Sequence, residues 1–504
     1  MSDPAATYEL LVSHARETAL LNSVAGILFW DEETYLPPAG GPYRAEQHAL
    51  LAKLGHARQT DPLLGDWLGE LANGPLASDP QSDTGTVITR LKRQYDKKTK
   101  LPPALVEELA RTASRSQQIW REARGANDFK QFEPLLTKMI ELKQQEAEAL
   151  GYTDSPYDAL LDEYEPDETT ANVATVLADL RQQLTPLVQQ IADSDRRPPS
   201  VMVDHYPTAR QEEFGKRAAA AIGFDFDAGR LDVTAHPFCG GGGPHDVRMT
   251  TRYDESDFIG GFFSILHEAG HGLYEQGLSA ESYGLPTGEA ISLGIHESQS
   301  RMWENLVGRS RGFWQFFFEP YVNTFANGGQ SGSWEDFYFA INEAKPSLIR
   351  VEADEATYNL HIIIRFELEQ ALLSGDLVVA DLPAAWNDRY GEYLGITPPS
   401  DADGVMQDVH WSAGLFGYFP TYALGNLYAS QFFEQAEQEI GPLEEAFAEG
   451  EFSPLRAWLG DKIHAVGQRQ SATELVQAVT GKRLSSAPLL RHLRAKFGEL
   501  YGFA

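Results

Sequence analysis

The most informative stretch of the chain is Asp257-Phe258-Ile259-Gly260-Gly261-Phe262-Phe263-Ser264-Ile265-Leu266-His267-Glu268-Ala269-Gly270-His271-Gly272-Leu273-Tyr274. Its apolar residues recur at the spacing of a well-buried helix, and Gly277 offers an end to that helix. Residues four apart share one helix face, so His267 and His271 can point their imidazole nitrogens at one ion. Glu268 is rotated away by about 100 degrees, where it can reach a water at the metal instead. This is the His-Glu-x-x-His spacing of zinc peptidases.

A catalytic zinc site also needs a third protein ligand and one open position. The segment from Ile291 to Arg301 is predicted to be helical, and it carries Glu297, 26 residues after His271. That separation suits a second helix running antiparallel to the first. His296 is the alternative ligand, since it adjoins Glu297 but faces another side of the helix.

Composition narrows the classes of protein. The chain has 504 residues, of which 42% are hydrophobic and 11% aromatic, as in a packed globular protein. Its net charge of −32 excludes a nucleic-acid partner, because a phosphate backbone demands a basic surface, and it disfavours anionic membranes for the same reason. Cys239 is the single cysteine, so no intrachain disulfide can form. With no signal-peptide pattern and no long apolar run, we expect a cytoplasmic protein without a membrane partner.

The pattern along the chain predicts a mainly helical fold with a small β element. Proline and glycine at 36–42 break the first helical stretch, and further amphipathic stretches lie near 104–124, 129–150 and 169–193. By length alone about three domains would be expected. The helical pattern instead favours a single unit, with a helical N-terminal part (about 1–200), a catalytic core (about 230–430) and a helical C-terminal part (about 430–504).

The β element is predicted between 230 and 255. Asp232–Phe238 and Asp246–Tyr253 are short β-rich pieces, and the glycine run from Gly240 to Gly243 lies between them. No Gly-Lys-Ser/Thr follows the run, so it is not a phosphate loop. We expect a hairpin or small sheet in which the glycines form a flexible connection.

Several motifs in order resemble the carboxypeptidase Taq family of thermostable metallocarboxypeptidases. The resemblance covers nearly the whole chain. It rests on Trp30-Asp31-x-x-Thr34 with Pro37, Gly40, Gly41, Arg44, Ala45 and Gln47, on His236-Pro237-Phe238, Asp246-x-Arg248-x-Thr250, His267-Glu268-x-x-His271, His296-Glu297-Ser298-x-Ser300, Ile349-Arg350-x-x-Ala353-Asp354, Gly404-x-x-Gln407-Asp408-x-His410-Trp411 and Gly417-Tyr418-Phe419-Pro420-Thr421-Tyr422.

The resemblance implies a saddle-like helical fold with a deep groove, assembled as a homodimer. It implies release of single C-terminal residues from peptides with broad side-chain preference. It also implies zinc as the metal, with Co²⁺ as a substitute. His267, His271 and Glu297 would then be the ligands, and Glu268 the catalytic base.

The remaining roles follow from what the chemistry needs. Zinc would lower the pKa of water from about 15.7 toward about 7. Oxyanion donors are then needed beside the metal, and His410 and Tyr418 are the candidates, with Tyr422 in reserve. Recognition of a terminal carboxylate calls for an arginine, which pairs with it through two hydrogen bonds. We assign that role to Arg350.

For Arg350 the alternative is a structural ion pair with Glu352 or Asp354. Arg248 and Arg252 are weaker candidates for the same binding role. The β element could present an edge to the substrate backbone, with His236 and Asp246 lining the site or orienting a ligand imidazole.

Two other functions fit the same sequence. One is a zinc aminopeptidase or endopeptidase with the same metal motif, although no Gly-x-Met-Glu-Asn run of the aminopeptidase kind is present. The other is a non-catalytic helical scaffold that binds a metal. Structural zinc sites usually fill all four positions with protein ligands, mostly cysteine, which argues against the scaffold.

Overall fold

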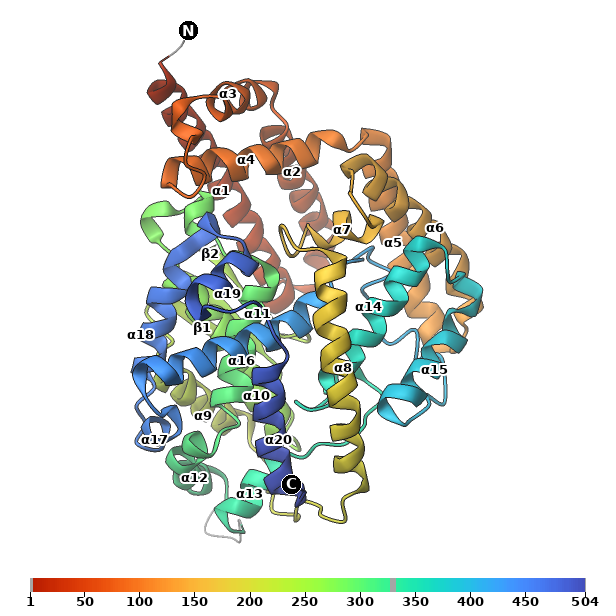
Figure 1. Ribbon diagram of the computed structural model, residues 1–504, viewed down its shortest axis with the longest axis vertical. Coiled ribbons are helices and arrows are strands. Elements are labelled where there is room, and N and C mark those ends of the chain that lie inside the picture. Colours follow the sequence, from red (N-terminus) through yellow and green to blue (C-terminus); the bar gives the residue numbers. More distant parts are fainter. Residues whose placement is uncertain (1–2, 327–331, 504) are drawn as a thin grey trace.

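Helices make up most of the molecule, and one small sheet lies among them (Figure 1). The structure is a computed structural model that describes residues 3–326 and 332–503. The helices of the first half are α1 (Pro4–Thr34), α2 (Gly41–Gln59), α3 (Pro62–Ala72), α4 (Asp83–Lys100), α5 (Pro103–Ala126), α6 (Phe129–Leu150), α7 (Pro156–Leu161), α8 (Thr170–Asp193) and α9 (Thr208–Ala221).

The second half continues the helical pattern around the predicted site. Its helices are α10 (Phe258–Gly277), α11 (Leu293–Arg301), α12 (Arg311–Phe325), α13 (Trp334–Ile341), α14 (Tyr358–Ser374), α15 (Leu382–Leu394), α16 (Pro420–Ile440), α17 (Leu443–Ala448), α18 (Ser453–Lys462), α19 (Ala472–Thr480) and α20 (Ala487–Tyr501). In Figure 1, α1 to α4 lie at the top, α5, α6, α14 and α15 to the right, and α9, α12 and α17 to the left. The prediction of a mainly helical fold is confirmed.

Predicted helices and breaks agree closely with the structure. The three amphipathic stretches correspond to α5, α6 and α8, and the Pro and Gly residues after α1 form a short 3₁₀ turn at Pro38–Gly40. Helix α10 begins after Asp257, whose carboxylate accepts a hydrogen bond from the backbone N–H of Gly260, and it ends at Gly277 as expected. Asp3 caps the first turn of α1 in the same way.

The sheet differs from the prediction in one respect. Its strands are β1 (Gly229–Val233), β2 (Cys239–Gly243) and β3 (Asp246–Thr251), in the order β1-β3-β2. The glycine run was expected to be a flexible connection, and this is wrong because it forms β2 and pairs antiparallel with β3. A Cβ at Gly241 would lie 2.1 Å from the carbonyl oxygen of Asp246, so only glycine permits this close pairing.

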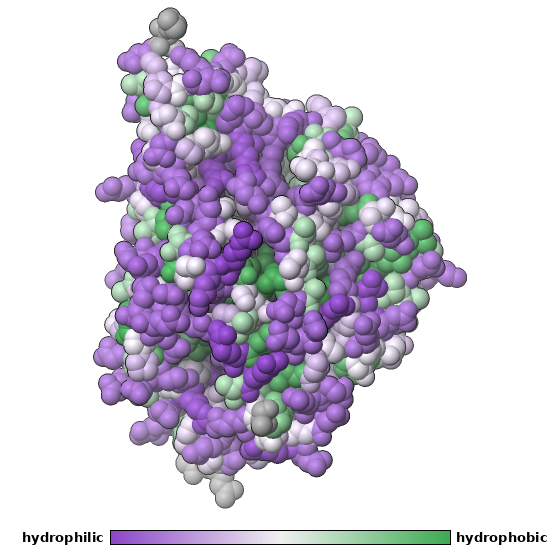
Figure 2. Space-filling model, viewed as in Figure 1, coloured by the Kyte–Doolittle hydropathy of each residue, from purple (hydrophilic) through white to green (hydrophobic). Residues whose placement is uncertain are grey.

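One large hydrophobic core surrounds α10. Phe258, Phe262 and Phe263 on this helix are at most 2% exposed and pack against aromatic side chains of α9 and α12. The β3 strand packs on the same helix. Figure 2 shows apolar residues gathered in the middle of one face of the molecule, between hydrophilic borders. The helix that carries the metal motif is therefore fixed by packing along its length.

Candidate active site

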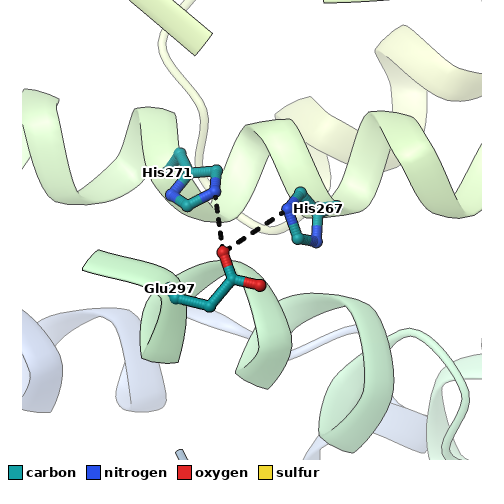
Figure 3. Close-up of side chains that lie close together, drawn as sticks. All are labelled: His267, His271 and Glu297. Carbon is teal, nitrogen blue, oxygen red and sulfur yellow. Dashed lines mark ion pairs between the residues drawn. The ribbon is translucent and has the colours of Figure 1, made fainter. Parts of the chain in front are cut away.

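Three possible metal ligands converge from two neighbouring helices. His267 and His271 project from α10 and Glu297 from α11, toward one point (Figure 3). The Oε2 atom of Glu297 lies 3.9 Å from Nε2 of His267 and 3.5 Å from Nε2 of His271. One ligand atom from each residue can be chosen so that all three lie within 4.8 Å of one another. Two imidazole nitrogens and one carboxylate oxygen form a donor set that suits a catalytic zinc ion.

Two glycines allow the helices to approach closely enough for this arrangement. A Cβ at Gly270, between the two histidines, would lie 2.6 Å from the backbone carbonyl oxygen of Gln299 on α11. A Cβ at Gly425 on α16 would lie 2.6 Å from Cγ of Glu297. Larger residues at either position would push α11 away from its neighbours.

The outer nitrogens of both histidines are already occupied. Nδ1 of His267 lies 2.9 Å from Oε2 of Glu304, and Nδ1 of His271 lies 2.6 Å from Nδ1 of His296. His296 in turn contacts Oε1 of Glu275 through its Nε2, at 2.6 Å. These contacts leave each Nε2 free to face an ion, which is how metal-binding imidazoles are usually oriented. The residues therefore fit a divalent metal.

His296, the alternative ligand, thus lies one contact away from the ion position and orients His271. Glu304 lies in a π-helical segment, Met302–Val307, that continues directly from α11. Such segments are rare and are frequent at functional sites.

The carboxylate of Glu297 is held in its ionised form. Burial alone would raise the pKa of Glu297, but Arg301 and the two histidines lower it far below its usual value. Nε of Arg301 donates to Oε1 of Glu297 at 2.7 Å, which leaves Oε2 facing the histidines. One oxygen is thus fixed by the protein and the other is directed at the ion position.

Glu268 lies beside this group and is only 6% exposed. Burial raises the pKa of Glu268 to about 7, and the nearby carboxylates of Glu297 and Glu304 add to the shift. A carboxylate with a pKa near neutrality is well matched to accepting and releasing a proton during catalysis. Its position next to His267 in sequence follows directly from the helical motif.

A second cluster holds the predicted oxyanion donors together with Arg350 and Tyr422, two of the predicted substrate-binding residues. Arg350 is 6% exposed and lies with its guanidinium carbon 5.1 Å from the ring centroid of Tyr422. The Tyr422 hydroxyl lies 3.4 Å from Nε2 of His410, and the ring of Tyr418 lies 5.4 Å from that of Tyr422. Arg350, His410, Tyr418 and Tyr422 are therefore brought together, as the sequence predicted.

The two clusters adjoin one another through Tyr358. The Tyr358 hydroxyl accepts from Nη1 of Arg350 at 3.1 Å, and the guanidinium of Arg301 lies 4.2 Å from the centroid of its ring. The charge of Glu297 contributes to raising the pKa of Tyr418 and of Tyr422, after burial as the largest cause for both. The metal ligands and the second cluster thus form one site.

The ion pair of Arg350 differs from the alternative considered above. Its partner is neither Glu352 nor Asp354 but Asp408, which lies 2.9 Å from both Nε and Nη2 of Arg350. Asp408 also accepts from Nε of Arg365 at 2.7 Å. One carboxylate is thus shared between two buried arginines, and it does not fully offset the charge of Arg350.

His410 is buried in its neutral form. Burial lowers the pKa of His410 to about 4, and Arg350 and Arg365 act in the same direction against Asp408. Within the described part of the chain, its buried Nδ1 has no hydrogen-bond partner, the nearest carboxylate oxygen of Asp408 being 3.9 Å away. A neutral imidazole can still donate one N–H bond toward a substrate oxygen.

The two candidates from the β element have other surroundings. His236 is exposed in the link between β1 and β2. Arg248 pairs with Asp246 at 2.7 Å, and its guanidinium lies 4.2 Å from the ring centroid of Trp30. The role of orienting a ligand imidazole, considered for His236 and Asp246, is taken instead by Glu304 and His296.

Sequence reasoning missed the residues that support the site. Glu304 could have been suspected because it lies seven positions after Glu297, on nearly the same helix face. Asp408 stands inside the His410 motif without an assigned role. Glu275 had no comparable signal, since its partner His296 lies 21 positions further on.

A helical scaffold with two histidines, a glutamate and a buried neighbouring carboxylate defines the metallopeptidase class. The comparisons with known proteins agree. The family model for carboxypeptidase Taq (M32) metallopeptidases matches residues 10–497. Thermostable carboxypeptidase 1 of Thermus thermophilus is 48% identical over 99% of this chain and 100% of its own length. Carboxypeptidase 1 of Bacillus subtilis is 38% identical over 97% and 96%.

Solved structures give the same result. The M32 carboxypeptidase from Deinococcus radiodurans R1 superimposes with a TM-score of 0.95 at 40% identity, covering 99% of this chain and 100% of that one. Pyrococcus furiosus carboxypeptidase superimposes with a TM-score of 0.93 at 34% identity, covering 97% and 99%. The chain belongs to the carboxypeptidase Taq (M32) family of metallopeptidases. It is a metal-dependent carboxypeptidase, a peptide hydrolase, and the predicted resemblance is confirmed.

Among residues 3–326 and 332–503, no helix combines the length and the apolar character that crossing a bilayer requires.

Proposed function

We propose that this enzyme uses zinc to release single residues from the C-termini of peptides, with broad side-chain preference. In this proposal His267, His271 and Glu297 hold the metal, and Co²⁺ can replace zinc. The observation that carries it is the convergence of the three ligand atoms beside Glu268, with Arg350 linked to the same site through Tyr358. Zinc held there supplies Lewis acidity, which activates water and polarises the scissile carbonyl.

Glu268 acts as the general base and then as the general acid. Its carboxylate accepts a proton from the attacking water and passes it to the nitrogen of the departing residue. The burial of Glu268 and its place directly after His267 support this role, since both keep the carboxylate beside the proposed ion position. Burial keeps bulk water from competing for the proton.

His410 and Tyr418 donate hydrogen bonds to the oxygen that becomes negative during attack. Such donors act most strongly when they are preorganised in a site from which water is excluded. His410 is 8% exposed and lies 5.5 Å from Tyr418, ring centroid to ring centroid. Tyr422 lies between His410 and Arg350 and is assigned to substrate binding.

Arg350 binds the terminal carboxylate of the substrate. A guanidinium has five N–H donors, and Asp408 and Tyr358 engage three of them. The two that remain can pair with a carboxylate through two hydrogen bonds. His236 and Arg248 are proposed as more peripheral contacts to the peptide backbone beside β2.

The test is to follow the products of unblocked and C-terminally amidated copies of one peptide by mass spectrometry. Stepwise loss of C-terminal residues from the unblocked peptide, with little action on the amidated one, is expected. Trimming from the amino end or internal cleavage would refute the carboxypeptidase assignment. Stoichiometric metal without cleavage of any peptide would favour a non-catalytic scaffold.

Three further expectations concern the assembly of the enzyme, its location and its domain organisation. The enzyme acts as a homodimer, it works in the cytoplasm, and residues 1–504 form one catalytic domain. The first follows from the family resemblance and the second from the single cysteine. Light scattering on the purified enzyme measures the oligomeric state.

A further inference from the structure

Two glutamates outside the proposed ligand set are completely buried near the active site. Glu369 on α14 and Glu165 before α8 both have 0% exposure, and each accepts three hydrogen bonds. Burial raises the pKa of each to about 7. Burying a carboxylate costs free energy unless hydrogen bonds replace those it made with water. The partners of these two residues therefore indicate what each carboxylate does.

The partners of Glu369 lie on the segment that carries the proposed oxyanion donors. Its Oε1 accepts from Nε1 of Trp411 at 2.8 Å, and its Oε2 accepts from the backbone N–H of Gly417 at 3.1 Å. The third donor is the Tyr157 hydroxyl on α7, at 2.7 Å. Trp411 directly follows His410, and Gly417 directly precedes Tyr418.

The tethered segment has no regular structure of its own. Residues 395–419 connect α15 to α16 and run through turns. Gly417 has a φ of +86°, and a Cβ there would lie 2.7 Å from the carbonyl carbon of Leu160. With no helix or strand to fix His410 and Tyr418, their positions depend on contacts such as those made by Glu369.

We propose that Glu369 is a positioning residue that holds His410 and Tyr418 at the distance and orientation needed to stabilise the transition state. The inference rests on the donor roles proposed above for these two residues. Glu369 acts through the loop and touches neither the metal ligands nor the substrate.

Glu165 provides a matched comparison. It accepts from the Ser292 hydroxyl at 2.7 Å, from the N–H of Gly294 at 3.0 Å and from the Tyr428 hydroxyl at 3.1 Å. The contacts with Ser292 and Gly294 hold the beginning of α11, the helix that carries Glu297, and Tyr428 belongs to α16. Glu165 thus has the same burial and the same number of hydrogen bonds as Glu369, but it supports the metal side of the site.

The decisive experiment compares Glu369→Gln with Glu165→Gln at pH 8, where wild-type Glu369 is ionised. An amide in place of the carboxylate turns one oxygen into an N–H donor, so either Trp411 or Gly417 loses its acceptor. Steady-state kinetics on an unblocked peptide and zinc affinity by chelator competition are measured for both. Their thermal unfolding is recorded as well.

For Glu369→Gln we expect kcat to fall about 10- to 100-fold with KM nearly unchanged, because donors that act only in the transition state are displaced. Its zinc affinity should match the wild type. For Glu165→Gln we expect zinc affinity to fall about 10-fold, with most of kcat regained at saturating zinc. A general loss of stability would not produce these opposite patterns.

A second pair of variants avoids changing the carboxylate. Trp411→Phe and Tyr157→Phe each remove one hydrogen bond to Glu369, but only Trp411 lies on the loop. The first should lower kcat about 10-fold, and the second should leave it close to wild type. Equal effects on kcat would overturn the inference, as would a Glu369→Gln enzyme with unchanged kcat or with reduced zinc affinity.

Tyr418→Phe, alone and combined with Glu369→Gln, distinguishes a failure of the proposed donor roles from a failure of the positioning role of Glu369. If Glu369 acts through the loop, its effect on kcat is smaller in the Tyr418→Phe background. If Tyr418→Phe and a matching His410→Gln leave kcat unchanged, the proposed donor roles are wrong. If these variants lower kcat but the effect of Glu369→Gln simply adds to theirs, the donors stand and the positioning role is overturned.

Discussion

The metal side of the active site and the substrate side are built in different ways. His267, His271 and Glu297 project from α10 and α11, which approach closely at Gly270, while Gly425 lets α16 pack against Glu297. Arg350, His410 and Tyr418 lie on 3₁₀ turns and an irregular segment, held by buried ion pairs and by Glu369. The difference teaches that the proposed metal ligands are placed by regular helices and oriented by neighbouring polar groups such as Glu304, whereas the proposed substrate-side donors lie on an irregular segment whose position depends on polar contacts from distant helices.

The largest effect is expected from Glu268→Gln. This variant tests whether, on the metal side, metal binding and proton transfer are carried out by different residues. Removing the base should lower kcat about 10²- to 10⁴-fold, because proton transfer contributes at that level. The three ligands are untouched, so one metal per chain should remain. Peptide hydrolysis followed by mass spectrometry and metal analysis by plasma emission give the two readouts. Loss of the metal would show that Glu268 belongs to the binding set instead.

On the substrate side, Arg350→Gln should lower kcat/KM about 100-fold on an unblocked peptide. The substitution removes the cation proposed to pair with the terminal carboxylate of the peptide in a buried site. The small residual activity on the amidated peptide should not change. Exposed Arg111 on α5 offers a control, and Arg111→Gln should leave both substrates unaffected. An equal loss on both peptides would mean that Arg350 supports the fold and does not read the C-terminus.

Glu304→Gln tests whether the hydrogen-bond partners of the ligand histidines contribute to metal affinity. The hydrogen bond to Nδ1 of His267 would weaken, and zinc affinity should fall about 10- to 100-fold. At saturating zinc, KM should stay close to wild type, because Arg350 and its neighbours are untouched. Chelator competition measures the affinity, with exposed Glu335→Gln as the control. A changed KM with normal affinity would contradict this division.

The tether on the substrate side should also affect stability in a pH-dependent way. The pKa of Glu369 rises from 4.5 to about 7 on folding, so between these pH values the native state binds a proton that the unfolded state has released. From this residue alone, the free energy of unfolding therefore decreases by about 3 kcal/mol as pH rises from about 4.5 to about 7. Other buried carboxylates also titrate in this range, so the measurement is the difference between the wild type and Glu369→Gln. In denaturant titrations of the metal-free proteins, the slope with pH should be steeper for the wild type than for the variant. An unchanged slope would contradict the raised pKa.

The smallest effect concerns the close approach of the helices. Gly270→Ala should lower the free energy of unfolding by about 1 to 2 kcal/mol, because its Cβ would meet the backbone of α11. Gly391 on α15 is the matched control, since a Cβ there has no atom within 4 Å. Gly391→Ala should be neutral or stabilising by up to about 1 kcal/mol, as alanine favours helix. Equal effects of the two substitutions would remove the argument for glycine at the crossing.

By itself, the sequence determined the helical architecture, the two histidines with Glu268, and Glu297 on the next helix. These are local patterns, written in the 3.6-residue period and in spacings of a few residues. The secondary structure of the glycine run could not be predicted from local sequence, because residues without side chains show no hydrophobic periodicity. It became a strand only through pairing with β3.

Only the tertiary structure decided what holds the site in place. Trp411 and Tyr157 reach Glu369 across 42 and 212 residues of chain, and Asp408 meets Arg350 across 58. A single sequence does not predict such contacts, because each of these polar residues could have been paired with any of many other polar residues in the chain. Burial selects among them, since each charge taken from water must find a partner that the fold brings close.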